Sequence, residues 1–384
     1  MNIQVAGVGL TKFGELWDKN LFDLALDAAS EALQDAGLDG RAIDAIYVGN
    51  MLSGTLTGQE HIGAVVASLI GSNAPAMKLE GACASGGLAM HAGVSSLLSG
   101  QYETVLVVGV EKMTDAPPNK VMAGLMGAGA EEERLAGLTF PGLYALMAKA
   151  HMAKYGTTKE HMAHVAVKNH YHASLNEKAQ FPFEISIEKV MKSSRITDPF
   201  TLFDASPITD GAAAVILTVE SRIKNQELRK KNVFISASTV ATDTISLSQR
   251  ESLTELKGTK IAGEKAFAKA GVSPKDIDVV EVHDCFTIAE ILAMEDLGFC
   301  AKGEAGEMVK NGHTRLGGML PMNTSGGLKA CGHPVGATGV KQIVEITQQL
   351  QGRGGRKQVE GAKVGLTQNV GGTGATVVIH ILQI

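Results

Sequence analysis

In one short segment of the chain, a cysteine lies among small residues and glycines. In Glu80-Gly-Ala-Cys-Ala-Ser-Gly-Gly, small residues flank Cys83, and a run compatible with a helix follows. Free N–H groups at the start of a helix favour a thiolate, so Cys83 is a candidate nucleophile. From this segment alone, a small buried cysteine in a tight turn is an equally good interpretation.

A second segment holds one imidazole in a loop of fixed shape. In Gly332-His-Pro-Val-Gly-Ala-Thr-Gly, His333 stands between a glycine and a proline. Such a rigid loop suits a general base or an oxyanion-hole donor. The glycines of Gln368-Asn-Val-Gly-Gly-Thr-Gly-Ala could also present backbone N–H groups to an oxyanion. This second loop lacks the Lys-Ser/Thr of a phosphate-binding loop and, by itself, is only a turn before a strand.

A third reactive segment, Val282-His-Asp-Cys-Phe, follows an apolar run that predicts a strand. It places His283 and Cys285 at the carboxyl end of that strand, where α/β proteins favour active sites. The alternatives are structural: Asp284 caps the helix that follows, and Cys285 fills the core.

An internal repeat indicates that two similar α/β halves position these segments. Ala28–Asn50 and Ala262–Asp284 align without gaps, and each predicts an amphipathic helix, a glycine stop and an apolar strand. A second pair, at 210–217 and 373–380, predicts a glycine turn that enters a buried strand. Convergence of common helix–strand units is the alternative, but two matches in the same order favour duplication.

The repeat also predicts the domain organisation. We expect an N-terminal half at residues 1–223 and a C-terminal half at residues 224–384. Within the first half, a segment dense in Met, His and Lys predicts an inserted loop or lid subdomain at about residues 114–202.

Composition excludes several other classes of protein. The 384 residues are 45% hydrophobic with a net charge of −5, which predicts neither a nucleic-acid surface nor a basic membrane patch. No signal peptide is expected at the N-terminus, and no apolar run is long enough for a membrane span. The scattered cysteines form no CxxC pair, so we expect free thiols, no structural zinc and a cytoplasmic location. They are Cys83, Cys285, Cys300 and Cys331.

Taken together, these motifs resemble the thiolase superfamily over essentially the whole chain. They occur in the family's order: the Cys83 segment, Ser206-Pro-Ile-Thr-Asp-Gly-Ala-Ala-Ala, His283-Asp-Cys-Phe, Gly332-His-Pro-Val-Gly-Ala-Thr-Gly and a terminal Gly-Gly-Thr-Gly. The resemblance implies an α/β thiolase fold, a duplicated five-layer αβαβα arrangement with an inserted loop domain. Within the superfamily the chain resembles the sterol-carrier-protein-type and archaeal-like thiolases, which place their second cysteine in His-Asp-Cys-Phe.

The resemblance also implies an activity and residue roles. The chain would be an acyl-CoA C-acyltransferase of lipid metabolism, which condenses acyl-CoA molecules or cleaves 3-oxoacyl-CoA with CoA. Cys83 would carry the acyl group, and His333 would take its proton. The N–H groups of Cys83 and Gly371 would hold the acyl oxyanion. Cys285 would remove the α-proton of the second substrate, while His333, with His283 or a water held by it, stabilises the enolate.

Binding roles and partners follow from the same resemblance. Ser206 would lie near coenzyme A, and Val121–Leu143 would shape the acyl pocket. We expect acyl-CoA and CoA as substrates, no metal or other cofactor, and a homodimer or tetramer. One alternative is the catalytic subunit of a complex with a small zinc-ribbon/OB-fold acyl-CoA-binding protein. Another is a decarboxylating ketoacyl synthase, which needs no second thiol and would leave Cys285 without a role.

Overall fold

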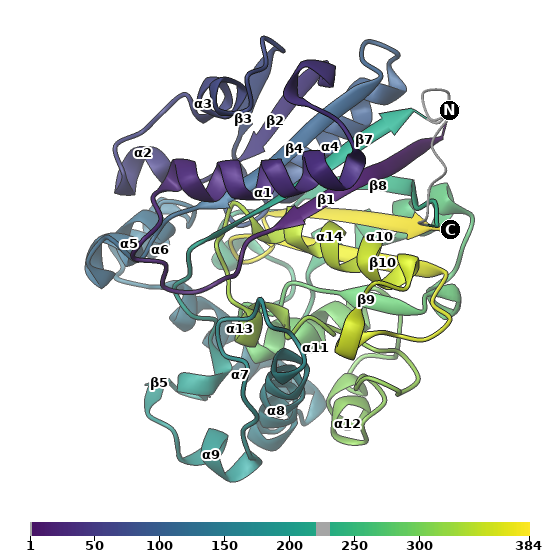
Figure 1. Cartoon of the computed structure of the whole chain (residues 1–384). Helices are drawn as coiled ribbons and strands as arrows, with labels where there is room; N and C mark the ends of the chain where they lie inside the picture. The colour runs from purple at the N-terminus through teal and green to yellow at the C-terminus, as the bar shows by residue number, and fades with distance from the viewer. Residues whose placement is uncertain (1, 220–230) are drawn as a thin grey trace.

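The centre of the protein is a nine-stranded mixed sheet made of two halves whose strand orders correspond, except that the edge strand of the first half has no counterpart in the second (Figure 1). The computed structural model describes residues 2–219 and 231–384. The first half contains, from its edge, β3 (Ala76–Leu79), β2 (Ala45–Gly49), β4 (Thr104–Glu111), β7 (Gly211–Val219) and β1 (Ile3–Leu10). The second half continues with β8 (Phe234–Thr242), β11 (Thr376–Gln383), β10 (Val364–Gly371) and β9 (Val279–Glu281).

Counted outward from the junction of β1 and β8, the two half-sheets show the same succession of strand pairings. Strand β1 pairs antiparallel with β7, as β8 does with β11. Next come the antiparallel pairs β7–β4 and β11–β10, and then the parallel pairs β4–β2 and β10–β9. Only one residue pair, Gln4 with Phe234, joins β1 to β8 in the ladder of the described residues. This matched order confirms the duplicated architecture.

Helices complete five layers around the two half-sheets. Helices α1 (Leu21–Ala36) and α3 (Ile62–Leu69) cover the outer face of the first half, and α10 (Lys257–Ala270) covers that of the second. Helices α4 (Ser85–Leu98) and α14 (Thr338–Gln351) contact strands of both halves and therefore form the middle layer. The αβαβα fold expected from the family resemblance is thus confirmed.

Close packing of the two middle helices brings the reactive segments together. A Cβ atom at Gly339 would lie 2.2 Å from the backbone nitrogen of Gly87, so only glycine allows this approach. Helix α4 begins two residues after Cys83, and α14 begins five residues after His333. The contact therefore sets the nucleophile segment against the histidine loop.

The predicted helix–glycine–strand repeat is present in both halves. A glycine in the left-handed backbone conformation caps the end of each helix: Gly37 (φ 67°) after α1 and Gly271 (φ 68°) after α10. A short 3₁₀ helix follows each, Gly40–Ala42 and Pro274–Asp276, before the buried strands β2 and β9. The expected boundary between residues 223 and 224 lies outside the described residues, so the domain limits stay a prediction.

The segment between β4 and β7 is mostly helical, and its later part lies at the lower end of the molecule in Figure 1. Its elements are α5 (Pro118–Met126), α6 (Glu131–Leu135), α7 (Phe140–Tyr155), α8 (Lys159–Ser174), α9 (Ile187–Lys192), β5 (Arg195–Thr197), β6 (Phe200–Thr201) and the 3₁₀ turn Leu202–Asp204. The other elements are α2 (Ser53–Leu56), α11 (Thr287–Asp296), α12 (Ala305–Lys310), α13 (Gly327–Cys331) and the 3₁₀ turns Leu247–Gln249 and Gly355–Lys357.

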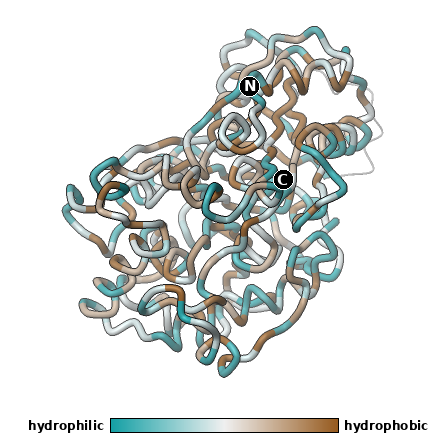
Figure 2. Tube along the Cα trace, turned by 90° about the vertical axis from the view of Figure 1, so that its left-hand side faces the viewer, coloured by the Kyte–Doolittle hydropathy of each residue, from teal (hydrophilic) through white to brown (hydrophobic). Residues whose placement is uncertain are grey.

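The hydrophobic core follows the sheet. Strands β4 and β7 are buried at every residue, because helices cover both faces. Figure 2 shows hydrophobic stretches in the interior and hydrophilic stretches along the outer turns. Among the helices of residues 2–219 and 231–384, none is long and apolar enough to cross a membrane.

Candidate active site

Three of the predicted reactive side chains line one cavity of about 240 Å³: Cys83, Cys285 and His333. They come from the starts of α4 and α11 and from the loop between α13 and α14. His283 is buried beside them, and its ring stands at 85° to that of His333 with 4.9 Å between centroids. The sulfur of Cys83 and one ring nitrogen of each histidine lie within 4.8 Å of one another. The structure therefore brings the three distant segments together.

The walls of this cavity are mostly apolar. Ser206 lines it, and its backbone N–H donates to the carbonyl of Cys285 at 2.9 Å. The Val121–Leu143 segment lines it through Met122, Leu125, Phe140 and Pro141, and Tyr144 follows directly. An apolar cavity with a few convergent polar groups is the usual form of a small-molecule site.

The glycine turn after β10 reaches the sulfur one residue later than the predicted donor. Gly371 is the last residue of β10 and borders a second cavity. Gly372 lines the first cavity, and its backbone N–H is hydrogen-bonded to the sulfur of Cys83. Within this turn, the N–H of Gly372 is therefore the group that faces the nucleophile.

A strained turn holds Cys83 at the start of α4. Ala82 has a φ of 55°, which is uncommon for a residue with a side chain. Its N–H donates to Glu80 Oε1 at 2.6 Å, and its carbonyl accepts from Ser85 Oγ at 2.6 Å. Ser85 Oγ also accepts from the N–H of Gly81 at 3.1 Å. These bonds fix the backbone on both sides of the nucleophile.

Burial, and not the helix end, decides the charge of Cys83. Although the residue is partly open to the cavity, burial raises the pKa of its thiol to about 12. The N–H groups of Gly372 and Cys83 lower it only in part, and the carboxylates of Glu111 and Glu80 raise it further. The thiolate expected from the helix N-terminus is therefore not the resting form. Burial likewise lowers the pKa of His333 to about 3, so thiol and imidazole are both neutral at pH 7.

Hydrogen bonds orient the ring of His333 as a base. Its Nδ1 lies 2.7 Å from Thr338 Oγ1, and that hydroxyl donates to the carbonyl of Pro334 at 3.1 Å. Because the hydroxyl proton is used there, the oxygen accepts from Nδ1–H of His333. The Nε2 atom then carries a lone pair. It is buried and has no hydrogen-bond partner within the described part of the chain.

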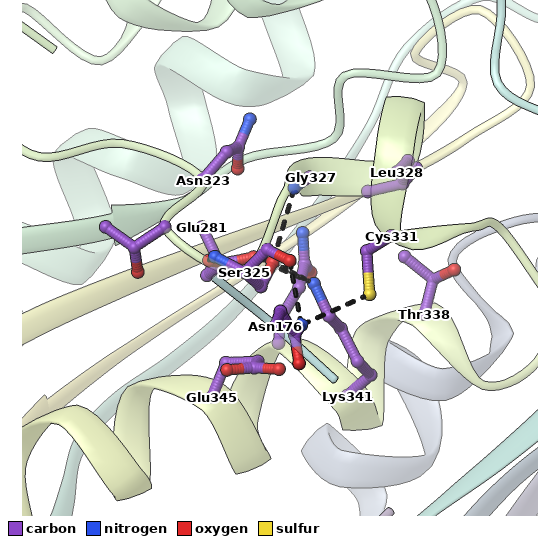
Figure 3. Close-up of polar contacts among 12 residues, drawn as sticks. Asn176, Glu281, Asn323, Ser325, Gly327, Leu328, Cys331, Thr338, Lys341 and Glu345 are labelled. Atoms are coloured by element: carbon purple, nitrogen blue, oxygen red, sulfur yellow. Dashed lines mark hydrogen bonds and ion pairs between the residues drawn. The ribbon is translucent and has the colours of Figure 1, made fainter. Parts of the chain in front are cut away.

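A buried polar network joins Glu281, Ser325 and Lys341 near the site (Figure 3). Lys341 pairs with Glu281 at 3.0 Å and donates to Ser325 Oγ, which itself donates to Glu281 at 2.7 Å. The network ties β9 to α14. Nearby, Asn176 Nδ2 lies 3.7 Å from the sulfur of Cys331, the last residue of α13. Sequence reasoning missed this network, because pairing between distant buried charges leaves no local pattern.

A tyrosine that the sequence did not single out contacts the second thiol. Burial raises the pKa of the Cys285 thiol, and the side chain of Tyr144 lies against this thiol. The Tyr144 hydroxyl donates to the carbonyl of Gly372 at 3.1 Å, and its ring stacks on Phe286 with 4.8 Å between centroids. Tyr144 lies within a helix of the inserted segment, and nothing in the sequence shows that it faces the cavity.

The raised pKa of Cys83 predicts a specific pH dependence of alkylation. The rate of Cys83 carbamidomethylation by iodoacetamide should rise about tenfold per pH unit from pH 7 to 10, without levelling near the usual thiol pKa of about 8.5. Rates are measured by peptide mapping, which separates Cys83 from Cys285. A plateau below pH 7 would instead reveal a resting thiolate–imidazolium pair and contradict the neutral pair.

The chain matches two family models that together cover most of its length. Residues 3–221 match the model described as "Thiolase, N-terminal domain". Residues 239–384 match the model described as "Thiolase C-terminal domain-like".

Similar proteins include curated sequences and solved structures. The chain is 48% identical to an acetyl-CoA acetyltransferase of Methanothermobacter thermautotrophicus, covering 100% of this chain and 99% of that protein. It is 37% identical to sterol carrier protein 2 of Homo sapiens, over 97% of this chain and 70% of that protein. The structure titled "Ltp2-ChsH2(DUF35) aldolase" is similar in fold, with a TM-score of 0.85 and 24% identity over 100% of this chain and 97% of that chain.

Proposed function

The chain belongs to the thiolase family, and on this premise we propose that it condenses acyl-CoA molecules and cleaves 3-oxoacyl-CoA through an acyl-enzyme on Cys83. It is an acyltransferase of the thiolase type. One observation carries the finer proposal: two thiols, Cys83 and Cys285, line the same apolar cavity as His333, whose Nε2 has no hydrogen-bond partner among the described residues. In this arrangement, one thiol can act as the nucleophile and the other as a separate acid/base.

The first half-reaction loads the acyl group on Cys83. As the sulfur attacks the thioester carbonyl, the lone pair on Nε2 of His333 takes the thiol proton. Transfer during attack avoids a free thiolate, which burial disfavours. The N–H of Cys83 and the glycine turn at Gly371 and Gly372 hold the oxyanion. Coenzyme A leaves and takes a proton from Cys285.

The second half-reaction forms the carbon–carbon bond. The thiolate of Cys285 removes the α-proton of the second acyl-CoA, and the enolate oxygen is held by the N–H groups of His333 and His283. The carbanion attacks the acyl carbonyl, and the tetrahedral intermediate expels Cys83, which recovers its proton from His333. Cys285 is left protonated, so every group returns to its starting state. Thiolysis is the reverse sequence.

We also propose the setting in which this chemistry takes place. The cavity takes the acyl chain, and Ser206 at its wall contacts coenzyme A. The enzyme acts in the cytoplasm as a homo-oligomer, with coenzyme A thioesters as substrates and no other cofactor. A decarboxylating synthase is disfavoured, because loss of carbon dioxide generates the carbanion without a thiol at Cys285.

A thiolysis screen tests the proposed function. The purified chain is assayed for CoA-dependent cleavage of 3-oxoacyl-CoAs that differ in chain length and branching, alone and with a small zinc-ribbon/OB-fold protein. The second arm is motivated by the solved structure whose title pairs Ltp2 with ChsH2(DUF35). We expect cleavage by the chain alone. Cleavage only in the second arm would assign it to a complex, and malonyl-CoA turnover without any thiolysis would contradict the proposal.

A further inference from the structure

We propose that Asn369 is a positioning residue that keeps the proton of His283 on Nε2, so that this ring is always a hydrogen-bond donor toward the reacting oxygen. The inference deepens the proposed function and rests on it for the meaning of the donated bond. It concerns a residue of β10 that neither lines the reaction cavity nor carries a titratable group.

The side-chain amide of Asn369 bridges three elements of the site. Its Oδ1 accepts from the backbone N–H of Gly87 at 3.1 Å, in the first turn of α4. Its Nδ2 lies 3.0 Å from the carbonyl oxygen of Cys83 and 3.2 Å from Nδ1 of His283. Asn369 and His283 are each only 1% exposed, so water does not compete for these bonds.

The contacts leave one orientation for this amide. If it were turned over, its NH₂ group would meet the N–H of Gly87, and its oxygen would meet the carbonyl of Cys83. Both contacts would be repulsive, so the NH₂ group must face His283. An amide NH₂ can only donate. Nδ1 of His283 is therefore an acceptor and carries no proton.

The remaining proton of the ring must then sit on Nε2. Burial, together with the nearby ring of His333, holds the pKa of His283 well below its usual range, so the imidazole is neutral. A neutral imidazole carries one proton. Nε2 of His283 is buried and has no hydrogen-bond partner within residues 2–219 and 231–384, which leaves its N–H available to a substrate oxygen.

The two histidines thus have opposite roles although they are neighbours. Thr338 takes the Nδ1 proton of His333 and leaves a lone pair on Nε2, whereas Asn369 donates to Nδ1 of His283 and leaves an N–H. One ring accepts the thiol proton, and the other donates to the enolate. The same tautomer works against chelation by Cys83, His283 and His333, because a metal ion needs a ring lone pair from each histidine.

Nitrogen NMR of histidine-labelled protein tests the tautomer directly. Two-bond ¹H–¹⁵N spectra at pH 8 distinguish protonated from lone-pair ring nitrogens, and His283 is assigned by the signal lost in His283→Gln. We expect the Nε2–H form in the wild type. In Asn369→Asp the carboxylate accepts from the ring, so the proton should move to Nδ1. Asn369→Ala, which offers neither donor nor acceptor, should show both forms.

Kinetics test the consequence with a matched background. Asn369→Asp should slow condensation by about 10²–10³-fold, the usual effect of one lost oxyanion donor. Exchange of labelled CoA into acetyl-CoA, which needs only the Cys83 acyl-enzyme, should fall less than tenfold. In a His283→Gln background, where an amide N–H replaces the ring, Asn369→Asp should lower the condensation rate much less than it does when His283 is present.

The outcomes separate this inference from the proposed function. An Nδ1–H form of His283 in the wild type, or an unchanged Nε2–H form in Asn369→Asp, would overturn the role of Asn369 whatever the activity. Equal losses of condensation in the His283 and His283→Gln backgrounds would do the same. Absence of both exchange and thiolysis in the wild type would refute the proposed function and leave the tautomer result standing.

Discussion

Replacing Cys83 by alanine should abolish acyl-enzyme formation and lower both thiolysis and condensation by at least about 10⁴-fold, because loss of a nucleophile removes every later step. The measurement is the steady-state rate with a 3-oxoacyl-CoA and CoA, together with the mass of the quenched protein. We expect no acyl adduct on the variant. The variant should still fold, because alanine is also small enough for the turn at position 83.

A second cysteine provides the control for this variant. Cys300 is half-buried, lies after α11 and does not line the reaction cavity. Cys300→Ala should keep the wild-type rate within about twofold. Comparable loss in both variants would point to a general effect of cysteine replacement, and substantial thiolysis by Cys83→Ala would place the nucleophile elsewhere.

Replacing Cys285 by alanine should separate the two half-reactions. Condensation and thiolysis should fall by about 10²–10⁴-fold, the usual effect of a lost acid/base. Exchange of labelled CoA into acetyl-CoA should stay within about tenfold, because Cys83 and His333 remain and a thiol is a good leaving group. Near-full condensation by this variant would refute Cys285 as the second base.

The architecture could be read from the sequence because its signals are local and repeated. Helix stops at Gly37 and Gly271 and apolar strands after them appear twice in the same order, and the structure has two matching half-sheets. The convergence of Cys83, Cys285 and His333 on one cavity was likewise expected, but from the family resemblance of the motifs and not from a local pattern.

Other features of the site depend on packing that no local pattern reveals. Tyr144 reaches Cys285 only because α7 packs at the cavity, and Asn369 of β10 contacts His283, which follows the neighbouring strand β9. The charge of Cys83 was misjudged for the same reason. A helix start favours a thiolate, but the loss of solvent outweighs it, and solvent access is a property of the folded chain.

The position of the covalent acyl group is the most direct test of the whole account. The Cys285→Ala variant is incubated with acetyl-CoA, quenched with acid and digested, and its peptides are analysed by mass spectrometry. One acetyl group should be found on the sulfur of Cys83 and should persist while acetyl-CoA is in excess, because the condensation step that consumes it is blocked. An acetyl group on another residue, or an unmodified Cys83 under conditions where the wild type turns over, would contradict the mechanism.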